Sequence, residues 1–344
     1  MIRPTMTSIL RFAAAAFTAL VVAGALAPAA GARTPFWLRP LPHPLDATSS
    51  VQSINRDGHL AGAALFADGS HAYLWRGRGG PLDLGLLGPG APAQSSATDV
   101  NRWDTVVGAS STDTGATHAF RWRHGVMSDL GTLGGDMSVA EAINDRGVIA
   151  GRASRADGEE RAVIWRNGRI RALRGLGGYS TAWDINDRGL IIGAAGRGGP
   201  GETDAVVWRR GRLIDLGTVG GVSAALMAVN RWGTAVGVWT DADGNDHAFL
   251  WRRGRITALR GVTLATAVND RGVVVGARLL DTSFGPYRAV IWRKGTSHLL
   301  SGLVTPRWTV DFAHDINNGG QIAADAVAPR TQFEHAVRLT PRRR

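Results

Sequence analysis

Three acidic residues occupy the same place in a repeated segment. Asp99, Asp184 and Asp315 each stand two residues before the asparagine that closes a short Ile-Asn or Val-Asn segment. Carboxylates gathered at the axis of a ring can bind a cation or a sugar hydroxyl. They can also act as the acid and base of glycoside hydrolysis, provided that their separation is right. The three residues are therefore candidates for the lining of a central channel.

An oxygen-rich loop offers a second kind of chemistry. The run of residues 241–246 reads Asp-Ala-Asp-Gly-Asn-Asp and has the look of a calcium loop. It departs from the EF-hand pattern, because its glycine falls at the fourth place and the distal glutamate is missing. Ordinary turn chemistry also explains such a sequence. We expect a turn, with calcium at Asp241, Asp243 and Asp246 as the alternative.

Histidine recurs once in each of four repeats, at His71, His118, His247 and His335. Zinc needs three or four ligands that converge on one point, and side chains from different repeats do not converge. We expect each histidine to sit at a strand edge, hydrogen-bonded to a neighbouring loop. The chain has no cysteine, which excludes thiolate metal sites and thiol catalysis, and it lacks the Gly-x-Ser-x-Gly and His-Glu-x-x-His patterns.

Arginine is the most prominent charged residue. The formal net charge is +11, and Lys294 is the only lysine. Arginine presents a rigid fork that binds carboxylate, sulfate or phosphate through two hydrogen bonds. In six repeats an arginine directly follows the tryptophan that closes one segment: Arg76, Arg123, Arg166, Arg209, Arg252 and Arg293. These positions predict a basic surface, although a genome rich in arginine codons, with soluble hairpin tips, explains the same composition.

These residues are carried by a unit of about 44 residues that repeats seven times. Each unit contains four short segments rich in Val, Ile, Trp and Leu, bounded by Gly, Asn and Asp, which is typical of strands. Tight Asn-x-x-Gly and Arg-x-Gly links join neighbouring segments as hairpins. The first segment of each unit ends at an asparagine: Asn55, Asn101, Asn144, Asn186, Asn230, Asn269 and Asn317.

The repeat predicts an all-β fold, a seven-bladed β-propeller of four-stranded antiparallel blades. The last unit stops after its third segment, at Leu339, and residues 37–41 supply a fourth segment without a blade of their own. We expect this N-terminal strand to complete the last blade, because closure removes exposed strand edges. A β-solenoid is the alternative.

The N-terminus has the pattern of a secretory signal peptide over residues 1–32. Arg3 and Arg11 form a positively charged region before an apolar run at residues 12–26, and residues 30–32 form a small-residue cleavage site. An uncleaved anchor is the alternative, but the run is short for a membrane span. We expect a single propeller domain over residues 33–344, secreted or periplasmic, without a transmembrane segment after cleavage and monomeric.

The combination Asp-Leu-Gly-Thr-Leu-Gly-Gly, Ile-Asn-x-x-Gly and His-Ala-Phe-Leu-Trp resembles the HAF family of extracellular repeat proteins over essentially the whole mature chain. The resemblance implies an exported bacterial repeat protein, and it supplies no catalytic residues.

Regular repetition favours a binding module. We expect an anionic polysaccharide, a lipid headgroup or an envelope protein as the ligand of the arginine surface, and no nucleic acid, because the chain is expected to be exported. The alternatives are a carbohydrate-active lyase or hydrolase with its site in the central funnel, and a structural matrix component.

Overall fold

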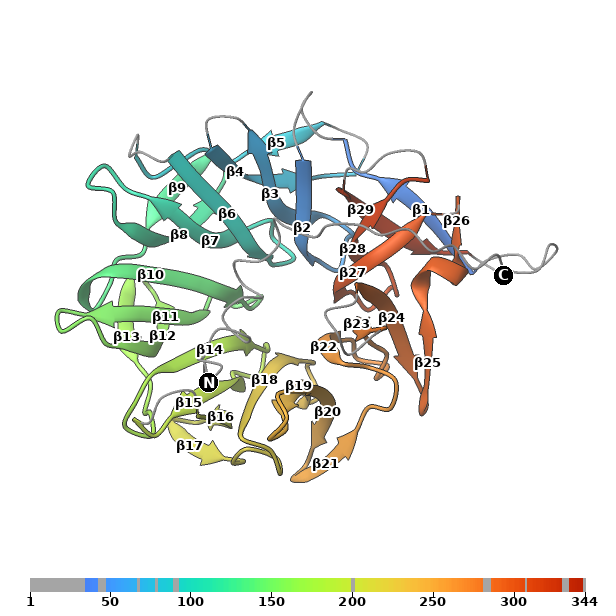
Figure 1. Ribbon diagram of the computed structural model, residues 1–344. Coiled ribbons are helices and arrows are strands. Elements are labelled where there is room, and N and C mark those ends of the chain that lie inside the picture. Colours follow the sequence, from blue (N-terminus) through green and yellow to red (C-terminus); the bar gives the residue numbers. More distant parts are fainter. Residues whose placement is uncertain are drawn as a thin grey trace.

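The chain forms a ring of seven antiparallel blades in the computed structural model, as the repeat predicted (Figure 1). The structure describes residues 35–42, 48–66, 69–77, 80–88, 93–198, 202–280, 286–306, 308–329 and 334–342. The expected signal peptide at residues 1–32 lies outside the described residues.

Blades 1 to 3 are built from strands β2 to β13, which short parallel pairings between β4 and β6 and between β8 and β10 join into one sheet. Blade 1 comprises β2 (Thr48–Ile54), β3 (Leu60–Phe66), β4 (Gly69–Trp75) and β5 (Pro81–Asp83). Blade 2 comprises β6 (Ala93–Val100), β7 (Val106–Ser111), β8 (Thr117–Arg123) and β9 (Val126–Asp129). Blade 3 comprises β10 (Gly134–Ile143), β11 (Ile149–Arg155), β12 (Glu160–Arg166) and β13 (Arg169–Ala172).

Blades 4 to 6 are separate four-stranded sheets. Blade 4 comprises β14 (Ser180–Ile185), β15 (Ile191–Gly196), β16 (Thr203–Arg209) and β17 (Arg212–Asp215). Blade 5 comprises β18 (Ser223–Val229), β19 (Thr234–Thr240), β20 (Asp246–Arg252) and β21 (Arg255–Ala258). Blade 6 comprises β22 (Leu264–Val268), β23 (Val274–Leu279), β24 (Tyr287–Arg293) and β25 (Thr296–Leu299). A short 3-10 helix, η1 (Leu300–Leu303), and β26 (Val304–Thr305) follow.

Blade 7 joins the two ends of the chain. It comprises β27 (Thr309–Ile316), β28 (Ile322–Val327), β29 (Glu334–Pro341) and, as its strand d, β1 (Phe36–Pro40). The two-residue strand β26 pairs in parallel along the outer edge of β1. Strand β1 runs antiparallel to β29, with Leu38 opposite Leu339. The predicted closure by an N-terminal strand is confirmed.

Within each blade the four strands are called a, b, c and d from the axis outward. The a–b hairpins have the predicted geometry, with glycine at a positive φ after the asparagine, as at Gly147 (φ 75°). In blade 2 the predicted substitute, Asp104, adopts the same conformation at φ 55°.

A bulge in strand a explains the glycine that recurs in strand b. In blade 3 the register shifts between Ala140 and Ala142, opposite Gly151. A side chain at Gly151 would overlap the main-chain oxygen of Val139. The same conflict faces Gly108, Gly193, Gly237 and Gly276.

The core consists of seven clusters of buried side chains that lie mainly between adjoining blades. Tryptophans at the end of strand c fill these spaces, and Trp75, Trp122, Trp165 and Trp208 are almost fully buried. Burial of a side chain of this size contributes several kcal/mol, on the order of 3 to 5 by truncation. In the part of the chain that the structure describes, no helix is long and apolar enough to span a bilayer.

A closed circle of hydrogen bonds links the seven blades near the axis. The Nδ2 atom of each strand-a asparagine donates to the main-chain oxygen of the equivalent asparagine in the next blade, over 2.9 to 3.2 Å. Asn317 of blade 7 donates to Asn55 of blade 1 and completes the circle. We call these seven residues the asparagine ring.

Each ring asparagine also fixes its own turn. The Oδ1 atom of Asn144 accepts hydrogen bonds from the main-chain N–H groups of Arg146 (3.1 Å) and Val148 (3.0 Å). One buried side chain therefore satisfies two donors of its own hairpin and one acceptor of the next blade. A buried polar group that loses its partner costs about 1–3 kcal/mol.

We predict that Asn144→Ala lowers the free energy of unfolding by about 2–4 kcal/mol, because it removes three buried hydrogen bonds and leaves their partners unsatisfied. Urea unfolding followed by tryptophan fluorescence measures the change. The exposed Asn245→Ala is the control and should cost less than about 0.5 kcal/mol. Equal stability of the two variants would refute the role given to the ring.

Candidate functional site

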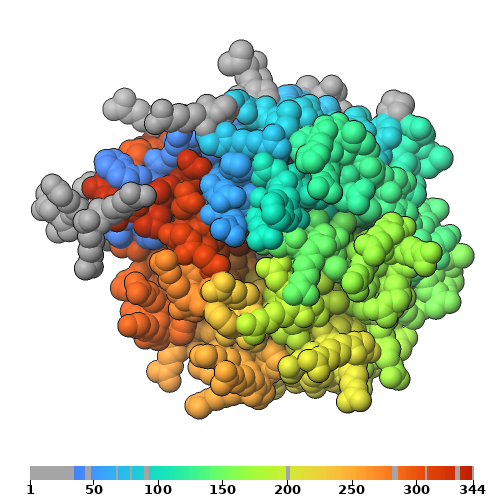
Figure 2. Space-filling view, turned by 180° about the vertical axis from the view of Figure 1, so that it is seen from behind, coloured from blue at the N-terminus to red at the C-terminus, as the bar shows by residue number. Residues whose placement is uncertain are grey.

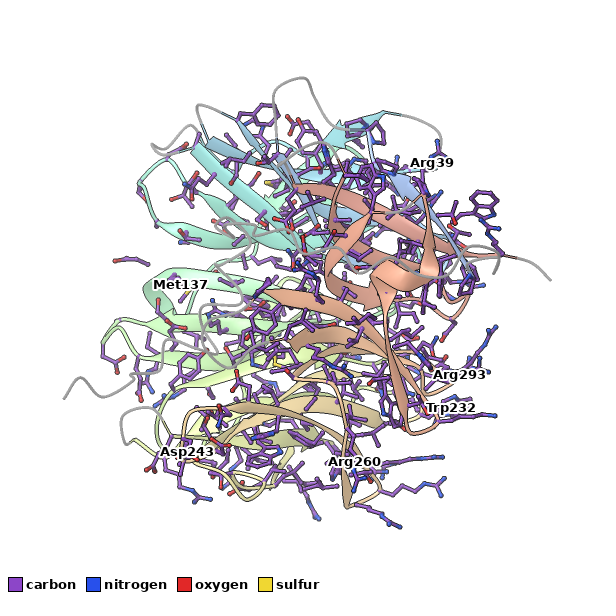
Figure 3. All side chains as sticks on the ribbon, turned by 45° about the vertical axis from the view of Figure 1, so that its right-hand side comes forward. Arg39, Met137, Trp232, Asp243, Arg260 and Arg293 are labelled. Atoms are coloured by element: carbon purple, nitrogen blue, oxygen red, sulfur yellow. The ribbon has the colours of Figure 1, made fainter. Side chains whose placement is uncertain are left out.

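The two faces of the ring differ in their loops. Figure 3 shows Trp232, from an a–b turn, and Arg293, from a c–d turn, on one side of the molecule, and Asp243 and Met137 on the other. We call the side formed by the a–b and c–d turns the arginine face. It is the face seen in Figure 2, where the blades follow one another round the centre in sequence order.

The structure brings the six predicted arginines to this face but spreads them round its rim, one in each of blades 1 to 6. Side chains alternate along a strand, so the tryptophan that ends strand c faces the core while the next residue faces solvent. Arg76 forms an ion pair with Asp104 at 2.8 Å. Among the described residues, the other five make no ion pair: Arg123, Arg166, Arg209, Arg252 and Arg293.

Of the six arginines in the a–b turns, three are paired with acids on the same face: Arg56, Arg102 and Arg231. Arg231 lies 2.9 Å from Asp270, and Arg102 lies 3.6 Å from Asp145. The uncompensated positive charge of the arginine face is therefore concentrated in its c–d turns.

Ion pairs also neutralise arginines on the opposite face. Arg152 contacts Glu141, Arg161 contacts Glu159, and Arg288 lies 2.9 Å from Asp311.

Sequence reasoning missed a feature of the c–d hairpins. Their two-residue turns have positive φ at both central positions, the conformation that favours Asn-Gly. Asn167 fills the first position in blade 3 at φ 52°, whereas blades 4 and 5 place Arg210 (φ 51°) and Arg253 (φ 52°) there. In each Trp-Arg-x-Gly link, x and Gly are the two central residues of the turn, so this sequence pattern could have predicted the positive φ angles.

Two hollows open on the arginine face. One, of about 830 Å³, is the mouth of the central channel and is lined by the a–b turns of all seven blades, including the asparagine ring. The other, of about 800 Å³, lies between blades 4 and 5. We call the second one the blade 4–5 groove.

The three predicted channel acids are structural links between blades. Asp99 accepts the main-chain N–H of Val100 in its own blade (2.7 Å) and of Ile143 in the next (2.8 Å). Asp184 and Asp315 make the equivalent bonds to Val229 (2.7 Å) and Ile54 (2.9 Å). Each carboxylate thus engages backbone donors with both oxygens, within a residue that is half-buried as a whole.

Burial makes these carboxylates hard to ionise. It raises the pKa of Asp99 to about 6, and repulsion from Asp315 adds to the effect, although hydrogen bonds from Ile143 and Ser53 oppose it. Burial, with repulsion from Asp99 and Asp315, raises the pKa of Asp184 to about 7. The pKa of Asp315 is raised by burial as well.

His71, His118 and His247 form hydrogen bonds with acids of their own blade. The Nδ1 atom of His71 lies 2.9 Å from Asp83, and that of His118 lies 2.7 Å from Asp129, both on strand d rather than in a loop. In blade 4 the charges are exchanged, because Asp204 replaces the histidine and contacts Arg197 at 2.8 Å. This recurring position therefore serves to pair charges across the blade.

The predicted calcium loop folds as a turn closed by Asp241. Its Oδ1 atom accepts the main-chain N–H groups of Asp243 (3.0 Å) and Asn245 (2.9 Å), and its Oδ2 atom lies 2.8 Å from His247. The bond from His247, with those from Asn245, lowers the pKa of Asp241 to about 2. Asp246 instead accepts a bond from Thr240. Within the described ranges, no three carboxylates or histidines are grouped to hold a metal.

A polar cluster in blade 7 was also missed, because its members come from three strands and from blade 1. Asp325 accepts bonds from Ser50 (2.8 Å) and lies 2.8 Å from the Nε2 atom of His314. Burial, with repulsion from Asp325 and Asp311, raises the pKa of nearby Glu334 to about 7. Burial also raises the pKa of Asp311 to about 6, against the attraction of Arg288.

Comparison with solved structures supports the propeller fold. The chain is similar to a puromycin-hydrolysing peptidase of Mycobacterium tuberculosis (13% identity, TM-score 0.56), with 90% of this chain covering 55% of that one. It is similar to a prolyl endopeptidase (13% identity, TM-score 0.53), covering 86% of this chain and 51% of that one. The β-propeller domain of the Trilobed protease from Pyrococcus furiosus matches at 9% identity and a TM-score of 0.46, over 86% and 84% of the two chains.

At these identities the similarities show the fold alone. No protein-family model matches the chain, and no curated protein matches it in sequence.

We predict that the free energy of unfolding falls as the pH rises from about 4 to about 7. The raised pKa values of Asp99 and Asp184 mean that the folded chain binds more protons than the unfolded chain between about pH 4 and pH 7, so the free energy of unfolding decreases through that window. Asp184→Asn should make this decrease smaller. Urea unfolding at four pH values measures it, with the exposed Asp243→Asn as the control. An unchanged slope in Asp184→Asn would contradict the prediction.

Proposed function

We propose that this protein is an exported binding module whose arginine face recognises an anionic polysaccharide. The observation that carries the proposal is a set of c–d arginines that make no ion pair with the described residues, on a face where three of the six a–b arginines are paired. These c–d arginines are Arg123, Arg166, Arg209, Arg252 and Arg293. An unpaired guanidinium is free to bind a carboxylate or sulfate through two hydrogen bonds.

The spread of these arginines favours a long ligand. They stand on five different blades, so a single small anion meets one or two of them, whereas a polymer that lies across the face meets several. Each weak contact adds to the others when the groups are linked, which raises the overall affinity. Lipid headgroups and an acidic envelope protein are the other ligands that this charge pattern would attract.

Export is part of the proposal and is supported by the pattern of residues 1–32. The closed ring needs no strand from a second chain, which supports a monomer. Calcium at Asp241, Asp243 and Asp246 is not part of the proposed mechanism, because Asp241 already accepts hydrogen bonds from its own turn.

A carbohydrate-active enzyme is the second candidate. The observation that favours it is the blade 7 cluster, where Asp311 and Glu334 have raised pKa values suited to a general acid. Cleavage of the polysaccharide would distinguish this function from binding alone.

We predict that replacing Arg166, Arg209 and Arg252 with Gln weakens binding to immobilised polygalacturonate by about tenfold or more at 50 mM salt, and flattens its salt dependence. The reason is that three unpaired charges leave the proposed contact surface. Affinity measured from 50 to 500 mM salt checks both effects, and the reducing ends released report any cleavage.

The control removes the same charge elsewhere. Arg155 ends strand β11, and Arg174 and Arg260 lie in the connections from strand d to the next strand a. All three are exposed and lie outside the a–b and c–d turns, so their replacement with Gln should change affinity by less than about threefold. Equal losses in the two triple variants would show unspecific attraction and contradict the proposal. Shortened polysaccharide would favour the enzyme instead.

A further inference from the structure

We infer that the blade 4–5 groove is the principal subsite for the polysaccharide and holds a run of uronate residues. This inference rests on the proposed function and adds to it a place and a ligand class. The groove lies on the arginine face between the yellow-green and yellow-orange blades of Figure 2.

The first reason is charge. Four arginines line the groove, Arg188, Arg209, Arg210 and Arg253, all of them exposed. In the part of the chain that the structure describes, no carboxylate lines the groove and none of the four makes an ion pair. A concave site with one sign of charge concentrates ligands of the other sign.

The second reason is backbone strain. Arg210 and Arg253 occupy the left-handed position of a tight c–d turn, where blade 3 has the preferred Asn167. His124 and Lys294 hold this position in blades 2 and 6, so the groove is where two adjoining blades both place arginine there. A long side chain is disfavoured in that conformation, and strained residues cluster where they serve function. Blades 4 and 5 thus have a less stable c–d turn than blade 3, and each of these turns places a guanidinium group in the same groove.

The third reason is an exposed aromatic ring beside these charges. Trp232 lines the groove and is 54% exposed. Two guanidinium groups contact this ring, that of Arg188 at 4.8 Å from the centroid and that of Arg231 at 4.6 Å. The contact orients Arg188 before a ligand arrives. The apolar indole surface suits the carbon–hydrogen face of a pyranose ring, while the arginines suit its carboxylate.

The contact between blades 1 and 2 provides an internal comparison. The a–b turn of blade 2 carries Trp103, which is 57% exposed. Trp103 is followed by Asp104, whereas Trp232 in the a–b turn of blade 5 is followed by Gly233. Asp104 neutralises Arg76 at 2.8 Å and lies 2.8 Å from the Nδ1 atom of His59. An exposed tryptophan therefore occurs in two a–b turns, and of these two only Trp232 lies in a groove lined by unpaired arginines.

The shape of the site favours a chain of sugars over a membrane. The groove is recessed between two blades and has a volume of about 800 Å³, within the range of sites that enclose small ligands. A narrow polymer segment can enter such a groove, whereas a flat bilayer surface meets only its rim.

The test uses trigalacturonate and isothermal titration calorimetry on the full mature chain. Arg210→Asn and Arg253→Asn together should weaken binding by about tenfold or more, and should raise Tm by about 2–4 °C because both turns gain the residue they prefer. Opposite effects on binding and stability separate a ligand contact from a structural role. Binding equal to that of the unmodified chain would overturn the inference.

Two matched controls complete the design. Lys294→Asn relieves the same strained position (φ 50°) and removes one charge outside the groove, so Tm should rise while affinity changes less than about twofold. Trp232→Ala should weaken binding by about tenfold, and Trp103→Ala should not. Equal effects of the two tryptophan variants would overturn the inference.

A last arm separates the inference from the proposed function. If the unmodified chain binds polygalacturonate but the groove variants bind trigalacturonate normally, the inference fails and the proposed function stands. If the unmodified chain binds neither sugar, both fail. Binding to vesicles of phosphatidylglycerol without binding to trigalacturonate would also overturn the inference.

Discussion

The asparagine ring is the interaction on which the rest of this structure depends. Seven amide side chains join the blades in a closed circle, and the bond from Asn317 to Asn55 connects the end of the chain to its beginning. Strand β1 closes the outside of blade 7, and the ring closes the inside. Because each asparagine also holds its own a–b turn, one residue type sets both the hairpin and its distance from the next blade. Buried polar groups that are fully satisfied in this way fix a single arrangement of the chain.

That constraint divides the arginine face into two zones. Near the axis, the a–b turns are held by the ring, and three of their six arginines are paired with acids such as Asp145 and Asp270. Further out, the c–d turns are two-residue hairpins whose residues are not part of the asparagine ring. Their side chains can therefore vary without disturbing the contacts between blades. Arg210 and Arg253 belong to this outer zone. The scaffold thus leaves its free charges where a ligand can reach them, in keeping with the general rule that function lies on loops positioned by a rigid framework.

Much of the fold was predictable from the sequence, because each recurring residue type marks the same local feature, a turn or a strand end, in every repeat. The Asn-x-x-Gly links, the Trp-Arg pairs and the split last unit led to seven blades and to the closing strand, and the structure confirms them. The partners across blades were not predictable, because a repeat of about 44 residues does not reveal which atoms of neighbouring units meet. For this reason Asp99 and Asp184 were expected to face a ligand but bind backbone N–H groups. The groove was missed because its residues come from four separate turns.

The central claim is that the blade 4–5 groove is where an anionic sugar chain binds. The most direct measurement is a two-dimensional NMR spectrum of the ¹⁵N-labelled tryptophan side chains, assigned by single Trp→Phe substitutions and recorded as trigalacturonate is added. The account predicts that the indole signals of Trp232 and Trp251, which line the groove, shift in a saturable way while those of Trp37 and Trp103 stay in place. Shifts centred on Trp183 of strand β14, or equal shifts at every exposed tryptophan, would contradict it.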